Sequence, residues 1–165
     1  MKTHARVVVI GGGAVGVSTL YHLTLKGWSD VVLLERSELT AGSTWHAAGL
    51  LPLFNMSYTV GQLHKYSVDL YKRLPAETGQ DVSFHVTGNL RLATNRDRMD
   101  EYLKYCGTAN TIGVPFQVIG PEEVKKLWPL VELGGKDGTP PIVGALYHPD
   151  DGHIAPADLT MALRK

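Results

Sequence analysis

Three glycines near the start of the chain have the spacing G-x-G-x-x-G, and they stand between an apolar run and a helical pattern. The run, Val7–Ile10, consists of β-branched residues and favours a buried parallel strand. The first glycine permits a sharp turn, the second lets the backbone approach a phosphate, and the third lets a helix pack close to the sheet. The N–H groups at the start of that helix favour an anion. The pattern predicts a dinucleotide pyrophosphate site, with a purely structural turn as the alternative, at Gly11, Gly13, Ala14, Val15 and Gly16.

An acidic residue follows the next apolar run. Val31–Leu34 predicts a second strand, and Glu35 comes 19 residues after Gly16. At the tip of this strand a carboxylate can accept hydrogen bonds from a ribose diol. Its charge also favours an unphosphorylated ribose over a 2′-phosphate. Residues 5–35 therefore form a predicted β-α-β unit that binds a dinucleotide.

A loop of small residues comes after Glu35 and Arg36 and reads L-T-A-G-S-T-W-H-A-A-G-L over residues 39–50. Such a loop can lie flat against a large planar ligand, with Ser43 and Thr44 as hydrogen-bond donors. From the residues alone, His46 is either a loop histidine bonded to backbone or a group that contacts the ligand.

Composition excludes several classes of function. The 165 residues make one domain the default, and an apolar fraction of 44% supports a core. Lys plus Arg and Asp plus Glu number 16 each, so no charge surplus favours nucleic acid or an anionic membrane. No apolar stretch approaches a bilayer span, and the early first strand leaves no room for a signal peptide. We therefore expect a cytoplasmic protein that binds no nucleic acid and has no membrane span, with a trimmed organellar chain as the alternative.

Individual residues outside the two motifs carry weaker signals. The single cysteine, Cys106, excludes an internal disulfide and is expected to be a small buried residue on a helix. Three histidines, His85, His148 and His153, lack the spacing of metal ligands, so no metal site is expected. Arg91 on a predicted strand could meet a carboxylate or form a surface ion pair.

The elements that position these residues follow from apolar periodicity and turn residues. A helix is expected over about 58–74, ended by Leu74-Pro75 and Gly79. Two short strands near 84–86 and 90–93 are expected to form a hairpin through Thr87-Gly88-Asn89. A further helix is expected to be capped by Thr94 or Asn95 and ended by Gly113, with a buried stripe at Met99, Tyr102, Leu103, Cys106 and Ala109. The remaining expected elements are a strand over 115–119, a helix from Pro121, a strand over 143–147 and a helix from Pro156.

This order departs from a simple doubly wound nicotinamide dehydrogenase, in which another helix and a third parallel strand should soon follow Glu35. We therefore predict an α/β chain: a Rossmann-like β-α-β fold with an inserted mixed or antiparallel β region, incomplete because its final helix is cut short. The expected divisions are 1–55 for the nucleotide unit and its loop, 56–150 for a partial α+β substrate-side region, and 151–165 for the return to the nucleotide domain.

Four segments together resemble a known group, the flavin-dependent amine oxidoreductases of the D-amino-acid-oxidase superfamily, in the dimethylglycine and sarcosine dehydrogenase branch. They are the glycine motif with Glu35-Arg36, residues 42–50 (G-S-T-W-H-A-A-G-L), residues 87–93 (T-G-N-L-R-L-A) and residues 151–156 (D-G-H-I-A-P) running to Leu159. Residues 42–50 are the most specific of the four.

The resemblance implies FAD rather than NAD, attached covalently through an imidazole nitrogen of His46. The glycine turn would meet the pyrophosphate, Glu35 the adenosine ribose and Arg36 the adenosine side. The ribityl chain and flavin would contact Gly42, Ser43, Thr44, Trp45, His46, Ala47, Ala48, Gly49 and Leu50.

The resemblance also implies oxidative demethylation of a small N-methyl amine or amino acid, with hydride passing from the methyl carbon to flavin N5. The electron acceptor would be oxygen, an electron-transfer flavoprotein or a quinone, and a later region would use tetrahydrofolate. The family's catalytic residues would lie beyond Lys165, so we expect no turnover from the isolated chain. Two alternatives stay open: a non-catalytic flavin-binding or regulatory relative, and an NAD-dependent dehydrogenase.

Overall fold

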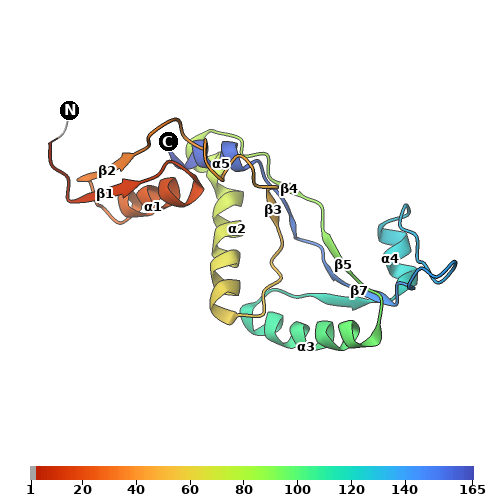
Figure 1. Cartoon of the computed structure of the whole chain (residues 1–165). Helices are drawn as coiled ribbons and strands as arrows, with labels where there is room; N and C mark the ends of the chain where they lie inside the picture. Colours follow the sequence, from red (N-terminus) through yellow and green to blue (C-terminus); the bar gives the residue numbers. More distant parts are fainter. Residues whose placement is uncertain (1–2) are drawn as a thin grey trace. The chain divides into compact units, whose positions relative to one another are not determined.

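A computed structural model describes residues 3–165 and divides the chain into two compact units. The first unit contains the N-terminal segment as far as Leu50, Asp69–His85 and His153–Lys165; the second contains Leu51–Val68 and Val86–Gly152. Figure 1 gives the positions of the helices and strands along the chain.

The first unit contains the predicted β-α-β arrangement. Strand β1 (Val7–Ile10) pairs in parallel with β2 (Val31–Leu34), and helix α1 (Ala14–Leu25) connects them. The register pairs Val7 with Val31 and Ile10 with Leu34, so both strands end at the same level. Helix α1 packs against both strands and against α5 (Pro156–Leu163). The Rossmann-like prediction is confirmed, and the parallel register places Gly11 and Glu35 at the same edge.

Helix α2 spans Tyr58–Thr78, so the prediction that Leu74-Pro75 ends it was wrong. Proline keeps a helical φ, but inside a helix it removes one backbone donor and its ring crowds the carbonyl four residues earlier, at a cost of about 3 kcal/mol that tertiary packing can offset. The side chain of Leu74 is 0% exposed, and Gly79 N–H donates to the Pro75 carbonyl over 2.9 Å. The helix therefore continues to Gly79, whose φ of +70° ends it.

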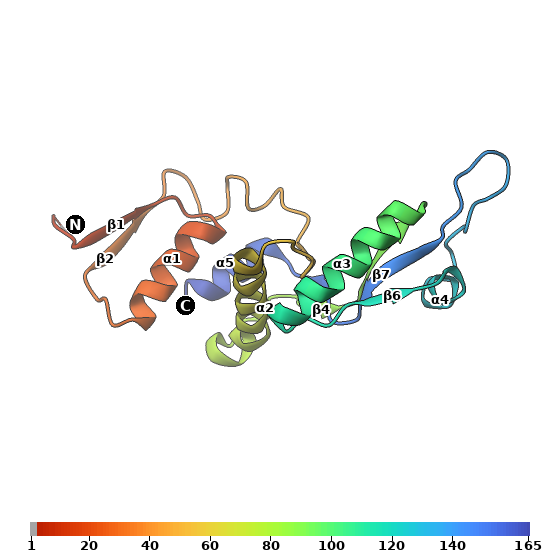
Figure 2. The same cartoon turned by 90° about the horizontal axis from the view of Figure 1, so that it is seen from below.

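The second unit has a three-stranded antiparallel sheet in the order β5-β7-β6. Its strands are β5 (Asn89–Ala93), β7 (Gly144–His148) and β6 (Gln117–Ile119). Helix α3 (Arg96–Ile112) runs along the sheet and packs against all three strands (Figure 2). The short helix α4 (Pro121–Leu127) packs against β7. The sequence predicts an inserted β region that is mixed or antiparallel, and this sheet is antiparallel.

The predicted hairpin through Thr87-Gly88-Asn89 was wrong. Strand β4 (His85–Val86) lies in a second small sheet, ordered β3-β8-β4, with β3 at Leu50–Leu51 and β8 at Gly152–His153. Strand β5 pairs instead with β7. The N–H groups of Thr87 and Gly88 donate to the Asp151 carbonyl, over 3.1 and 2.8 Å. Partners distant in sequence therefore replace the local pairing.

Helix α3 begins and ends as predicted, although its buried stripe differs. The Asn95 side chain accepts a hydrogen bond from Arg98 N–H, and Gly113 is left-handed at φ +78°. Leu103 was expected in the core but is 58% exposed. The buried positions are Tyr102, Tyr105, Ala109 and Ile112, which recur at helical spacing one turn apart. Within residues 3–165, no helix is both long and apolar enough to cross a membrane.

The choice between Thr94 and Asn95 as the cap of α3 is testable. Asn95→Ala removes the side-chain oxygen that accepts Arg98 N–H, and we expect it to lower the free energy of unfolding by about 1 kcal/mol. Thr94→Ala, one residue earlier on the exposed turn, should change it by less than about 0.5 kcal/mol. Urea unfolding followed by circular dichroism measures both. Equal losses for the two variants would contradict the assigned cap.

Candidate functional site

The candidate site lies in the first unit, where β1 and β2 end side by side. Gly11 N–H donates to the Leu34 carbonyl over 2.8 Å, so the parallel ladder continues one step beyond the strands. Gly11 has a φ of +111°, which a residue with a side chain rarely adopts. The chain therefore leaves β1 in a sharp turn at Gly11, next to the point where β2 ends and Glu35 follows.

Close backbone approach in the turn requires glycine. A Cβ at Gly16 would lie 1.9 Å from the Gly11 carbonyl oxygen, so α1 could not pack this close to the turn with any other residue. A Cβ at Gly13 would lie 2.8 Å from Thr44 Oγ1. Glycine at these two positions is therefore required by close packing within the protein, Gly16 against the Gly11 carbonyl and Gly13 against the Thr44 hydroxyl.

Glu35 fastens the glycine turn to the end of β2. Gly12 N–H donates to Oε2 over 2.6 Å, and Ser37 N–H donates to Oε1 over 2.9 Å. These hydrogen bonds, first from Gly12 and then from Ser37, lower the pKa of the Glu35 carboxyl below its ordinary value. The carboxylate is thus held ionised, and each oxygen keeps acceptor capacity for a hydroxyl group.

The start of α1 is open to an anion. Its N-cap residue is Gly13, which has no side chain to cap the helix, and no acidic residue occupies the first turn. Ala14 N–H donates to Thr44 Oγ1 over 2.9 Å, which ties the small-residue loop to the helix. Because the Thr44 oxygen accepts this bond, its own hydroxyl hydrogen can donate elsewhere.

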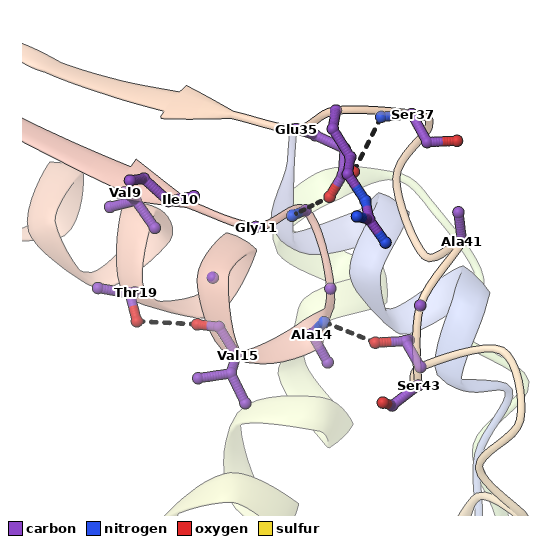
Figure 3. Close-up of a pocket in the computed structure, with 16 residues that line it drawn as sticks. Val9, Ile10, Gly11, Ala14, Val15, Thr19, Glu35, Ser37, Ala41 and Ser43 are labelled. Atoms are coloured by element: carbon purple, nitrogen blue, oxygen red, sulfur yellow. Dashed lines mark hydrogen bonds between the residues drawn. The ribbon is translucent and has the colours of Figure 1, made fainter.

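These groups surround one cleft of about 790 Å³ (Figure 3). The predicted site residues that line it are Gly11, Gly13, Ala14, Val15, Gly16, Glu35, Arg36, Gly42, Ser43 and Thr44. The lining that sequence reasoning missed is Val9, Ile10, Gly12, Thr19, Ser37 and Ala41. The sequence holds no signal for Ser37, because it contributes a backbone N–H that any residue other than proline would supply.

The remaining predicted residues, 45–50, lie outside this lining. The rings of Trp45 and His46 face each other with centroids 3.9 Å apart, and Trp45 is 61% exposed. His46 Nδ1 lies 3.1 Å from the Gly42 carbonyl oxygen. A carbonyl only accepts, so Nδ1 carries the proton and the lone pair of the neutral ring is on Nε2. His46 is thus bonded to backbone and still presents one nitrogen that can react.

Two residues weighed from the sequence lie in the second unit. Cys106 is partly buried on α3, and burial raises the pKa of its thiol. The Arg91 guanidinium lies 4.0 Å from the centre of the Phe54 ring. Its Nε is buried without a hydrogen-bond partner among residues 3–165, so the expected surface ion pair is not what holds it.

Comparison with known proteins identifies the same class of fold. The model of the family described as FAD dependent oxidoreductase matches residues 6–165. The solved L-proline dehydrogenase from P. horikoshii aligns with a TM-score of 0.88 and 29% identity, over 99% of this chain and 41% of that one.

Two curated relatives match nearly the whole chain. Mitochondrial dimethylglycine dehydrogenase of Rattus norvegicus is 48% identical over 98% of this chain. The mitochondrial pyruvate dehydrogenase phosphatase regulatory subunit of Mus musculus is 37% identical over 99%. In both comparisons this chain spans 18% of the relative's own length.

The lowered pKa of Glu35 predicts a pH dependence of stability. A carboxyl whose pKa is lower in the folded chain stabilises the fold above its ordinary range, and this contribution is lost as pH falls through the folded pKa. Between about pH 5 and about pH 3, the melting temperature of the native chain should therefore fall more steeply than that of Glu35→Gln.

Glu38→Gln is the matched control, because Glu38 is an exposed acid three residues away. Its melting temperature should follow the native curve across the same pH range. The account of Glu35 would be wrong if the Glu35→Gln curve also ran parallel to the native one.

Proposed function

The chain belongs to the FAD dependent oxidoreductase family, and from this premise we propose that it is the FAD-binding part of an enzyme that oxidatively demethylates N-methyl amino acids. The observation that carries the proposal is the glycine turn fastened to Glu35 beside the open start of α1. An anion at the helix start and a diol at the carboxylate are the two polar ends of an adenosine diphosphate group.

The residues of the cleft fit FAD by their chemistry. We assign the pyrophosphate to the backbone of the turn, where Gly13 and Gly16 leave no room for side chains. Glu35 accepts hydrogen bonds from the adenosine ribose, and its charge opposes a 2′-phosphate. Arg36 faces the adenosine side. Gly42, Ser43 and Thr44 in the cleft, together with residues 45–50 that follow them outside its lining, contact the ribityl chain and the flavin, with the hydroxyls of Ser43 and Thr44 as donors.

His46 is the proposed point of covalent attachment. Its Nδ1 is engaged by the Gly42 carbonyl, which leaves Nε2 as the nitrogen with a free lone pair. We assign Nε2 as the atom that bonds to the 8α carbon of the flavin. The hydrogen bond to Gly42 keeps the ring in the tautomer that this bond requires. Covalent attachment prevents loss of the cofactor and strengthens it as an oxidant.

Bound FAD supplies a two-electron acceptor, to which the substrate's N-methyl carbon would deliver hydride at N5. The dimethylglycine dehydrogenase relative supports this substrate class, of which sarcosine is another member. Oxygen, an electron-transfer flavoprotein or a quinone would reoxidise the flavin. Tetrahydrofolate would capture the one-carbon unit in a region outside these residues.

The proposal assigns a separate role to each of three segments of the chain. Residues 1–55 hold the cofactor, residues 56–150 belong to the substrate side, and residues 151–165 return to the cofactor domain. The curated relatives are several times longer than the chain, and no catalytic residue is assigned within it. We therefore propose that residues 1–165 alone have no turnover.

A second candidate function has its own support. The match to a regulatory subunit is 37% identical over 99% of the chain, so the same scaffold also occurs in a protein named for regulation. In that case the chain would belong to a flavin-binding or regulatory protein without turnover. The substrate experiment below separates the two functions.

Covalent attachment is tested by acid precipitation of the complete gene product. We expect flavin fluorescence to stay with the native polypeptide in the pellet, because the bond to His46 survives denaturation. In His46→Ala the fluorescence should pass to the supernatant. His64→Ala, at a histidine on helix α2, is the control and should behave as the native protein. Complete release of flavin from the native protein would refute the covalent bond.

The substrate class is tested by mixing the flavin-loaded complete gene product with candidate amines without oxygen. Dimethylglycine and sarcosine should bleach the flavin absorbance, because hydride from the N-methyl carbon reduces it. Glycine, which lacks the N-methyl group, should leave it oxidised. If no amine bleaches the flavin but dithionite does, the result would favour the second candidate, a flavin-binding or regulatory protein without turnover.

A further inference from the structure

Two histidines that have no role in the function proposed above lie side by side in the first unit. His85 is on β4 and His153 is on β8, and these two strands are neighbours in the small sheet β3-β8-β4. The centres of the two rings are 5.1 Å apart, and the ring planes are inclined at 43°. Both residues are exposed, so an ion from solution can reach them. The sheet thus brings together two imidazoles that stand far apart in the sequence.

The distance between the two rings fits two ligands of one metal ion. An imidazole nitrogen binds zinc at about 2.0–2.1 Å, and two ligands of a tetrahedral ion subtend about 109° at the metal. With each ring centre about 1.1 Å behind its bound nitrogen, two such imidazoles have their centres about 5.2 Å apart. The observed 5.1 Å agrees with this distance. Rotation of an imidazole about its Cβ–Cγ bond turns the nitrogens while the ring centre stays nearly in place, so both rings can face one ion without a backbone shift.

The backbone around the pair is fixed within the first unit. Ala155 N–H donates to the Val82 carbonyl over 3.2 Å, and Gln80 Nε2 donates to the Asp158 carbonyl over 3.4 Å. The side chains of Val82 and Ile154, each close in sequence to one of the two histidines, are 0% and 5% exposed. Ligands that are already held in place lose little freedom when an ion binds, so their affinity is higher.

The chemistry of the pair selects a class of ion. Neutral imidazole is a good ligand for zinc, nickel and copper, whereas magnesium and calcium prefer oxygen ligands. Within residues 3–165, no group of three or more histidine, cysteine or acidic side chains is placed to hold a metal. The other coordination positions would therefore be open to water. His148 takes no part, because it is buried against Asp151 in the second unit.

We propose that His85 and His153 together bind one divalent transition-metal ion, of the class of zinc. The chain leaves the first unit after His85 and returns to it at His153, so a shared ion joins the two ends of this excursion. An ion that binds the folded chain but not the open loop of the unfolded chain stabilises the fold. The site uses no residue assigned to the flavin, so the inference does not depend on the proposed function.

The site is tested by isothermal titration calorimetry with zinc chloride on the metal-free complete gene product. His85→Ala and His153→Ala should each weaken the binding of one zinc ion by at least about tenfold, because a single imidazole cannot chelate. The double variant should lose no more than either single variant, because both changes remove the same site. His4→Ala, at an exposed histidine of the same unit, is the control and should bind zinc as the native protein does.

Melting temperatures distinguish metal binding from a structural role of the two side chains. Without metal, the three single variants should melt within about 2 °C of the native protein, because the substituted side chains are exposed. Zinc should raise the melting temperature of the native protein and of His4→Ala by more than that of His85→Ala or His153→Ala. Magnesium chloride should not displace the zinc.

The inference is overturned if His85→Ala and His153→Ala bind zinc with the native stoichiometry and affinity, which is the result that a purely aromatic contact between the rings would give. It is overturned equally if the losses in the two single variants add up in the double variant, since the histidines would then bind separate ions. Displacement of the zinc by magnesium would also contradict it, because that result requires oxygen ligands.

Discussion

The 2.6 Å hydrogen bond from Gly12 N–H to the Glu35 carboxylate is the constraint from which the rest of the cleft follows. It requires β1 and β2 to end at the same level, which the parallel register from Val7 and Val31 to Ile10 and Leu34 provides. It also requires the turn at Gly11 to pack closely against the start of α1, and only glycine at position 16 permits that close contact. One carboxylate thereby fastens the turn, stays ionised, and lines the cleft in which we propose that the ribose binds.

The features encoded by neighbouring residues were predictable from the sequence. The glycine spacing, the strand runs and the acid after the second strand specify the β-α-β unit, because each acts within a few residues of its partner. The ends of α3 were readable for the same reason: Asn95 caps its own helix and Gly113 adopts the left-handed conformation. The lining of the cleft followed largely from these local signals.

Features that depend on distant partners were not predictable in the same way. Thr87-Gly88-Asn89 has the composition of a hairpin turn, yet its N–H groups bond to Asp151, more than sixty residues later in sequence. Pro75 suggests a helix end, yet the buried Leu74 beside it keeps the helix intact. Leu103 is apolar, yet the helix turns Tyr105 and Ile112 toward the core instead. In each case tertiary packing outweighed a local preference.

The central claim is that the cleft at the ends of β1 and β2 binds FAD in preference to a nicotinamide cofactor. Isothermal titration calorimetry on the cofactor-free His46→Ala form of the complete gene product tests it most directly. The account predicts saturable binding of one FAD per chain, weakened by Glu35→Gln, and much weaker binding of NAD. Binding of NAD as tightly as FAD, or FAD binding that Glu35→Gln leaves unchanged, would contradict it.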